Sequence, residues 1–98
     1  MAELFATVKT GELAGSASAV QMPDKPCSRA RVKACNDNTG AVCVGFSNSV
    51  TLPDGTTDTT TGFPLYAGDD TGWIEITNLN LLYYISATGD DLVYWTIG

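Results

Sequence analysis

The sequence predicts an all-β protein, a small antiparallel β-sandwich or β-barrel with an extended N-terminal arm. Only 16% of its 98 residues are charged, against about 25% in an average globular domain. The chain is instead rich in Thr, Gly, Ser, Asn and Asp. These residues favour turns and strand faces over helix surfaces. Turn signals recur roughly every ten residues, which is typical of small sandwiches and barrels. A chain of this length forms a single core.

The first 26 residues are expected to form a short strand and an arm. Residues 3–8, ELFATV, suit a strand, whereas residues 9–26 are rich in small residues, contain two Gly and two Pro, and have no helical period. A second short strand is compatible with residues 17–21. We therefore assign residues 1–26 to an N-terminal strand and an extended arm that lies on, or pairs with, a neighbouring subunit, and residues 27–98 to the core of a single domain.

The segment 27–35, CSRARVKAC, carries three of the five cations in the chain. Arg29, Arg31 and Lys33 stand two residues apart, and small apolar residues lie between them. Because successive side chains of a strand point to opposite faces, this spacing predicts a strand with an apolar inner face and a cationic outer face.

A hairpin is predicted next, because residues 36–41, NDNTGA, have the composition of a turn. In the register that follows, Cys35 lies opposite Cys43 and Val32 lies opposite Phe46. Val32 and Phe46 then face the core, and the three cysteines share the outer face with the cations.

The remaining elements follow from alternation and turn residues. Residues 47–62 are polar, contain the turn signal Asp54-Gly55, and are expected to form a loop or a ragged edge strand. In WIEIT, Ile74 and Ile76 are expected to point inward and Glu75 outward. The further turns and strands are, in order, the corner at 63–72, the turn at 78–80, the strand at 81–87, the turn at 88–91 and the strand at 92–97.

Charge and composition argue against several functions. The chain has a net charge of −6, which opposes duplex DNA binding, since that needs clustered cations. It contains no histidine, which removes the commonest general base and zinc ligand. No catalytic residue, metal site or cofactor is predicted, although hydrolysis by paired carboxylates stays open. The N-terminus lacks the pattern of a signal peptide and no stretch is long enough to span a membrane, so synthesis in a cytoplasm is expected.

Several stretches together resemble small β-rich virion proteins of tailed bacteriophages. In that pattern a VKA-like strand end and an Asn- or Gly-rich turn precede a V-x-V-G strand; a G-x-P-L-x-x-G corner, an N-L-N turn and a Y-x-x-A strand follow. The matching stretches are Val32 to Ala34, Val42 to Gly45, Gly62 to Gly68, Asn78 to Asn80 and Tyr84 to Ala87. The resemblance covers about residues 17–97.

The resemblance implies a structural component of the particle, such as a capsid decoration or cement protein or a small head or tail appendage. The implied location is the virion, and the implied partners are the major capsid protein or other virion subunits, commonly with the chain as a homotrimer. The resemblance supplies no catalytic residue.

The row of cations has more than one interpretation. Arg29, Arg31 and Lys33 are either the solvated face of a strand or a surface that meets an acidic partner. The chain itself offers acidic loops at 69–70 and 90–91. A single-stranded nucleic-acid track is the weakest interpretation, because no aromatic residue alternates with these cations.

The cysteines and the acidic pairs are weaker candidates for sites. Cys35 and Cys43 are a possible cross-strand disulfide, although plain thiols are favoured for a protein that folds in a cytoplasm. The spacing of the cysteines does not suit zinc. Calcium at the Asp-Asp loops is an alternative, but Asp and Gly in turns explain these loops without a ligand.

Aromatic residues crowd the last third of the chain, and rings on an outer face usually pack on another layer or another chain. The candidate interface residues are Arg29, Arg31, Lys33, Trp73, Tyr83 and Trp95. We expect a capsid decoration protein that binds and stabilises the assembled head through these contacts; the alternative is a tail-associated adhesin that stacks its rings on glycan.

Overall fold

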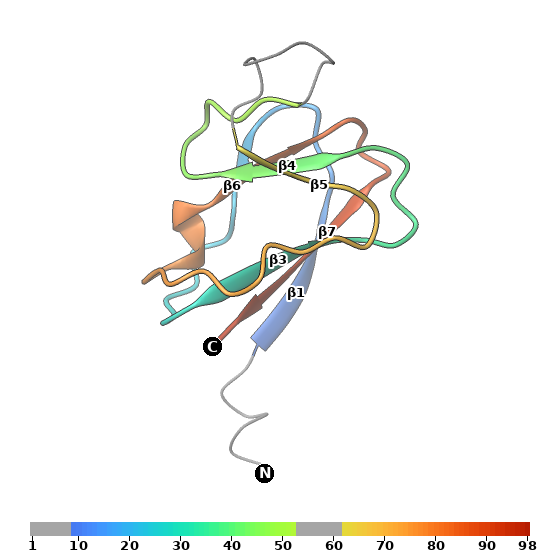
Figure 1. Cartoon of the computed structure of the whole chain (residues 1–98). Coiled ribbons are helices and arrows are strands. Elements are labelled where there is room, and N and C mark those ends of the chain that lie inside the picture. Colours follow the sequence, from blue (N-terminus) through green and yellow to red (C-terminus); the bar gives the residue numbers. More distant parts are fainter. Residues whose placement is uncertain (1–8, 53–61) are drawn as a thin grey trace.

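The computed structural model describes residues 9–52 and 62–98. Two expectations, the strand at 3–8 and the turn at Asp54-Gly55, lie outside these residues. The described part forms two antiparallel sheets packed on one another as an unclosed sandwich, so the predicted fold class is confirmed and the sandwich is the form it takes (Figure 1).

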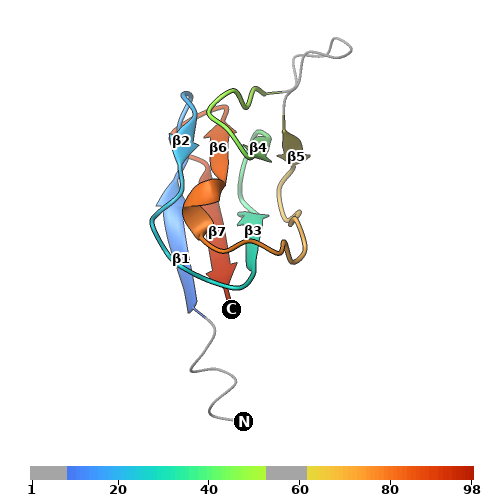
Figure 2. The same cartoon turned by 90° about the vertical axis from the view of Figure 1, so that its left-hand side faces the viewer.

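One sheet has three strands in the order β1-β7-β3, and the other has four in the order β2-β6-β4-β5. Figure 2 shows the strands of each sheet following one another across the view in these orders. The strands are β1 (Lys9–Ala14), β2 (Val20–Gln21), β3 (Ala30–Ala34), β4 (Val42–Gly45), β5 (Phe63–Leu65), β6 (Tyr83–Ser86) and β7 (Leu92–Ile97), with one 3-10 turn, η1 (Leu79–Leu81).

Strand β3 has the alternation that its sequence predicts. Ala30, Val32 and Ala34 are fully buried, whereas Arg31 and Lys33 are exposed. The inner residues join a core that both sheets supply. Its members are Met22, Ala30, Val32, Ala34, Val42, Val44, Leu65, Leu79, Leu82, Tyr84, Val93, Trp95 and Ile97.

The predicted hairpin between residues 27–35 and 42–46 is wrong. Strand β3 pairs with β7, and β4 pairs with β5 and β6 in the other sheet. The turn at 36–41 therefore carries the chain from one layer to the other instead of reversing it within a layer. As a result Cys43 is buried in the four-stranded sheet, and Phe46, which was expected in the core, is 68% exposed.

The prediction of an extended arm is also partly wrong, because residues 9–14 form strand β1, which pairs within the same chain. This strand pairs with β7 along its whole length, from Lys9 opposite Ile97 to Ala14 opposite Leu92. Strand β2 at Val20–Gln21 lies within the expected second strand and pairs with β6. Strands β1 and β2 thus integrate this segment into both sheets.

The free edge of β3 is covered by residues 69–74, which we call the edge segment. Ala30 and Ile74 exchange backbone hydrogen bonds of 2.9 and 2.7 Å, and Thr71 N–H donates to the Val32 carbonyl at 2.9 Å. The predicted strand at 73–77 is reduced to this isolated bridge. The predicted directions are confirmed, since Ile74 and Ile76 pack against the core and Glu75 is exposed.

The turns at 78–80 and 88–91 lie where the sequence predicts. Asn78 caps η1 by accepting from Asn80 N–H at 2.9 Å. The turn at 88–91 connects β6 to β7 and so crosses between the sheets. Asp91 in this turn is 2% exposed, and its carboxylate accepts hydrogen bonds from the loop at 36–41, which also crosses between the sheets.

Candidate interaction surface

The three cations of the basic row lie along the edge segment, and two of them contact it. The Arg29 guanidinium stacks on the Trp73 ring, 4.0 Å from its centroid. Arg31 donates to Asp70 Oδ2 at 2.7 Å. The residue pair Lys33 and Asp70 forms an isolated backbone bridge. The row is therefore an exposed strand face whose charges are partly matched within the same chain.

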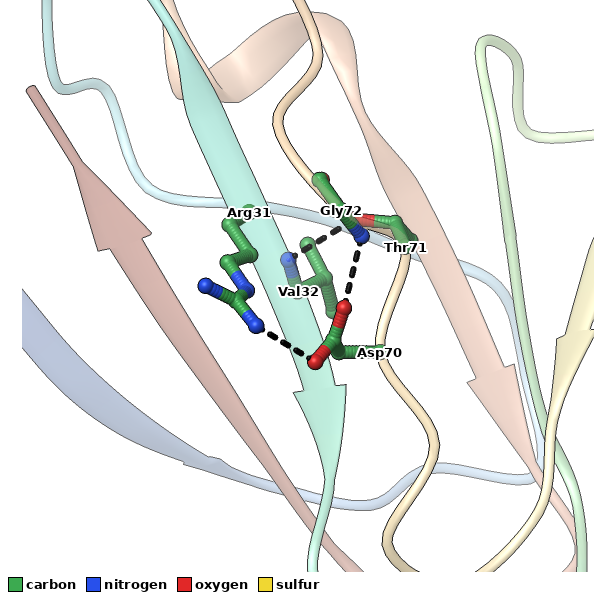
Figure 3. Close-up of polar contacts among 5 residues, drawn as sticks. All are labelled: Arg31, Val32, Asp70, Thr71 and Gly72. Carbon is green, nitrogen blue, oxygen red and sulfur yellow. Dashed lines mark hydrogen bonds and ion pairs between the residues drawn. The ribbon is translucent and has the colours of Figure 1, made fainter.

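Asp70 also organises the edge segment itself. Its second carboxylate oxygen accepts from Gly72 N–H at 2.7 Å, and Thr71 Oγ1 accepts from Val32 N–H at 3.1 Å (Figure 3). The Arg31 hydrogen bond, and then the Gly72 N–H, lower the pKa of the Asp70 carboxyl below its ordinary value of 3.8. Both donors stabilise the ionised form.

The lowered pKa of Asp70 gives a testable prediction. Because the pKa in the folded state lies below the unfolded value, this pair stabilises the fold near neutral pH and loses its contribution as the pH falls through the folded pKa. We expect an NMR titration of the Asp70 carboxyl to show a midpoint below 3.8, and Arg31→Gln to raise it. The control Lys9→Gln removes a cation from β1 and should leave the midpoint unchanged; equal shifts in both variants would contradict the assignment.

The three cysteines are free thiols at separate places. The possible Cys35–Cys43 disulfide is not formed, because Cys35 follows β3 in one sheet and Cys43 lies in β4 of the other; the favoured alternative, plain thiols, agrees with the structure. Cys35 accepts a hydrogen bond of 3.5 Å from the Tyr94 hydroxyl, which raises the Tyr94 pKa. Burial raises the pKa of Cys27 and of Cys43, which lowers their thiolate fraction and their reactivity.

The acidic pairs are used in turns. Asp69 accepts from Tyr66 N–H at 3.1 Å and Asp70 accepts from Gly72 N–H, both within their own turn, whereas Asp91 accepts from the loop at 36–41. Within residues 9–52 and 62–98, no group of three or more Cys, Asp or Glu side chains is arranged to hold a metal ion. These contacts support the interpretation of both pairs as turn residues.

The predicted aromatic interface residues divide into two groups. Trp73 is 41% exposed, and Tyr83 is half-buried between Gln21 of β2 and Gly45 of β4. Trp95 is 8% exposed and belongs to the core, so its assignment to an interface is wrong. In the pair Tyr94-Trp95 it is Tyr94 that faces outward.

An exposed apolar surface was missed by the sequence analysis. Phe46 is 68% exposed and Phe63 is 58% exposed, and both line an open hollow of about 430 Å³. The other lining residues are Val44, Gly45, Ser47, Val50 and Gly62. We call this the Phe46–Phe63 surface. The available signal was the position of Phe46 directly before the turn residues Ser47 to Ser49, where the strand ends.

The same hollow continues toward the edge segment. A second space of about 200 Å³ shares four of the lining residues and adds Thr71, Ile74 and Leu82. Gly45 lets Val50 pack directly against the strand, because a Cβ there would lie 2.4 Å from the Val50 side chain. Gly62 has a φ of +113°, a conformation that favours glycine. None of the described residues that line either space carries a charge.

No protein-family model, curated protein or solved structure matches this chain. In the described part of the chain, no helix has the length and apolar character needed to cross a membrane. The class that the fold defines is therefore a small all-β sandwich with exposed apolar and aromatic side chains on its surface.

Proposed function

We propose that this chain is a structural virion protein of a tailed bacteriophage, of the capsid decoration type, which binds the assembled head and stabilises it through subunit contacts. Two independent lines support the proposal. The resemblance across residues 17–97 provides the class of particle. The observation that supports a role in protein contacts is the exposure of the Phe46 and Phe63 side chains.

Two large aromatic side chains that are more than half exposed at one hollow are unusual for an isolated soluble domain. At 68% and 58% exposure, the two rings together leave about 250 Å² of surface that gains free energy when a partner covers it. Apolar groups that converge on a hollow commonly serve as anchors at the centre of a protein interface. Phe46 and Phe63 therefore support binding to another protein over binding to a charged polymer.

The edges of β3 and β5 support contact through side chains rather than through strand addition. The free edge of β3 is covered by the edge segment. The outer strand β5 has three residues, and its central residue, Pro64, has no N–H to donate. A partner strand thus finds no continuous row of donors along β5, so side chains have to provide the affinity at this end of the sandwich.

Glycan binding receives less support. Stacking on sugar needs an accessible aromatic face, and Arg29 occupies one face of Trp73 at 4.0 Å. A glycan array separates the two functions. Specific sugar binding that is lost in Trp73→Ala would favour the adhesin.

Decoration is tested by incubating the purified chain with undecorated heads of the phage that encodes it. We expect saturable binding and a gain in the resistance of the heads to heat and to chelator, because a decoration protein bridges neighbouring shell subunits. Heads that already carry the protein are the control and should bind none. Heads that neither bind the chain nor gain resistance would remove the proposal.

A further inference from the structure

Charges of opposite sign balance along the edge segment, in contrast to the rest of the chain. Three cations, Arg29, Arg31 and Lys33, belong to or precede β3, and three acids, Asp69, Asp70 and Glu75, belong to or follow the edge segment. The chain has five cations and eleven acids, so two cations and eight acids remain elsewhere. The region is therefore neutral in a molecule of net charge −6.

The neutral region adjoins the Phe46–Phe63 surface. Thr71 and Ile74 line the smaller part of the apolar hollow. Their neighbours in the sequence, Asp70 and Trp73, contact Arg31 and Arg29 respectively. One flank of the sandwich thus combines an uncharged apolar hollow with a stripe of cations beside a stripe of acids.

We propose that this flank is a self-association surface and that its occupant is a second copy of this chain. Two copies of an acidic protein repel each other unless they meet where the local charge is balanced. Two parallel stripes of opposite sign are also self-complementary, since a two-fold axis places the cations of one copy opposite the acids of the other. The apolar hollow then provides the driving force. The proposal deepens the proposed function, because it names the surface through which subunits of the decoration layer meet.

The size of the apolar patch sets the expected strength. At 68% and 58% exposure, Phe46 and Phe63 together offer about 250 Å², whereas a stable interface buries about 800 Å² on each partner. The charged border has to contribute the rest of the contact. We therefore expect a reversible association that depends on protein concentration and weakens as salt screens the stripes.

The test is sedimentation equilibrium of the full chain, with light scattering as a second measure of mass. We expect a mass of at least twice 10.3 kDa at about 1 mM protein and the monomer mass on dilution. The double variant Phe46→Ser with Phe63→Ser should stay monomeric. The matched control Leu81→Ser removes another exposed hydrophobic residue, 46% exposed on η1, and should associate like the unmodified chain. Lys33→Glu should weaken association several-fold at low salt.

Circular dichroism and thermal melts establish that each variant is folded. A measurement on the unmodified chain does not depend on any variant: raising its concentration should shift the amide NMR signals of Phe46, Phe63 and Ile74, and not that of Leu81. A monomer mass at every concentration, or association that survives the double variant, would overturn the inference. A chain that stays monomeric yet binds heads would contradict the self-association inference and support the decoration function. A chain that forms oligomers but does not bind heads would support self-association and contradict the decoration function.

Discussion

Replacing Asp91 with asparagine is expected to lower the free energy of unfolding by about 1–3 kcal/mol. Asp91 is 2% exposed. Its Oδ1 accepts from Thr39 N–H at 3.0 Å and its Oδ2 accepts from Gly40 N–H at 3.2 Å. Asparagine keeps one oxygen for Thr39 but turns an NH₂ group toward the Gly40 N–H. A buried donor then loses its acceptor and faces another donor.

Asp91→Ala should cost more, about 2–5 kcal/mol, because both backbone N–H groups of the loop lose their acceptor. Urea denaturation at neutral pH measures the two variants. The matched control is Asp90→Asn, since Asp90 is exposed and its neighbour carries the buried contacts; it should stay within about 0.5 kcal/mol of the unmodified chain. Equal losses at positions 90 and 91 would show that the carboxylate does not hold this loop.

The size of the effect follows from the position of Asp91 in the sandwich. The loop at 36–41 takes the chain from β3 to β4, and the turn at 88–91 takes it from β6 to β7. Each therefore crosses from one sheet to the other. Asn38 adds to the link, since its side chain donates to the Leu92 carbonyl at 2.9 Å and accepts from Leu92 N–H at 2.8 Å. Asp91 thus connects the β3–β4 and β6–β7 crossovers at one end of the sandwich.

Sequence patterns predicted those elements whose side chains sort by a period of two. In β3 the cations alternate with Ala30, Val32 and Ala34, and burial follows the same alternation. Strand β7 was predicted for the same reason, and the turn before it was predicted from its Gly and Asp residues. Ile74 and Ile76 point inward as predicted although no full strand forms there, because the direction of a side chain depends on local backbone geometry and not on complete pairing.

Pairing between strands was the part that local patterns did not determine. The composition of NDNTGA indicates that the chain turns, but it does not indicate whether the next strand joins the same sheet or the opposite one. In the structure β3 pairs with β7, more than fifty residues later in the sequence. The predicted contact between Cys35 and Cys43 assumed that β3 pairs with β4. It is wrong because these two strands belong to different sheets.

The candidate site was predicted in part. The exposed cations and Trp73 were identified from the sequence, but their contacts with the edge segment depend on tertiary structure. Phe46 follows the same alternation as Val42 and Val44 and was placed in the core. The strand ends at Gly45, however, and the next residues turn away. A period of two predicts burial only as long as the strand continues.

Replacing Trp95 with alanine is expected to destabilise the fold by about 3–5 kcal/mol, whereas Trp73→Ala is expected to cost about 1 kcal/mol or less. Trp95 is 8% exposed in the core, and Trp73 is 41% exposed beneath Arg29. The two variants remove the same side chain, so the difference between them measures the burial of Trp95 against the partial burial and Arg29 contact of Trp73. The measurement is urea denaturation at low protein concentration, where self-association does not add to stability.

Gly11 explains why Trp95 belongs to the core although strand alternation by itself left it an interface candidate. The two residues are opposite each other in β1 and β7, and a Cβ on Gly11 would lie 2.4 Å from the Trp95 ring. The ring therefore fills the space that a side chain at position 11 would take, and Gly11→Ala should also destabilise the fold, since the ring has little room to move among its core neighbours. Equal stability losses for Trp95→Ala and Trp73→Ala, with no effect of Gly11→Ala, would contradict the placement of Trp95 in the core. They would also contradict the packing of β1 on β7 that closes this side of the sandwich.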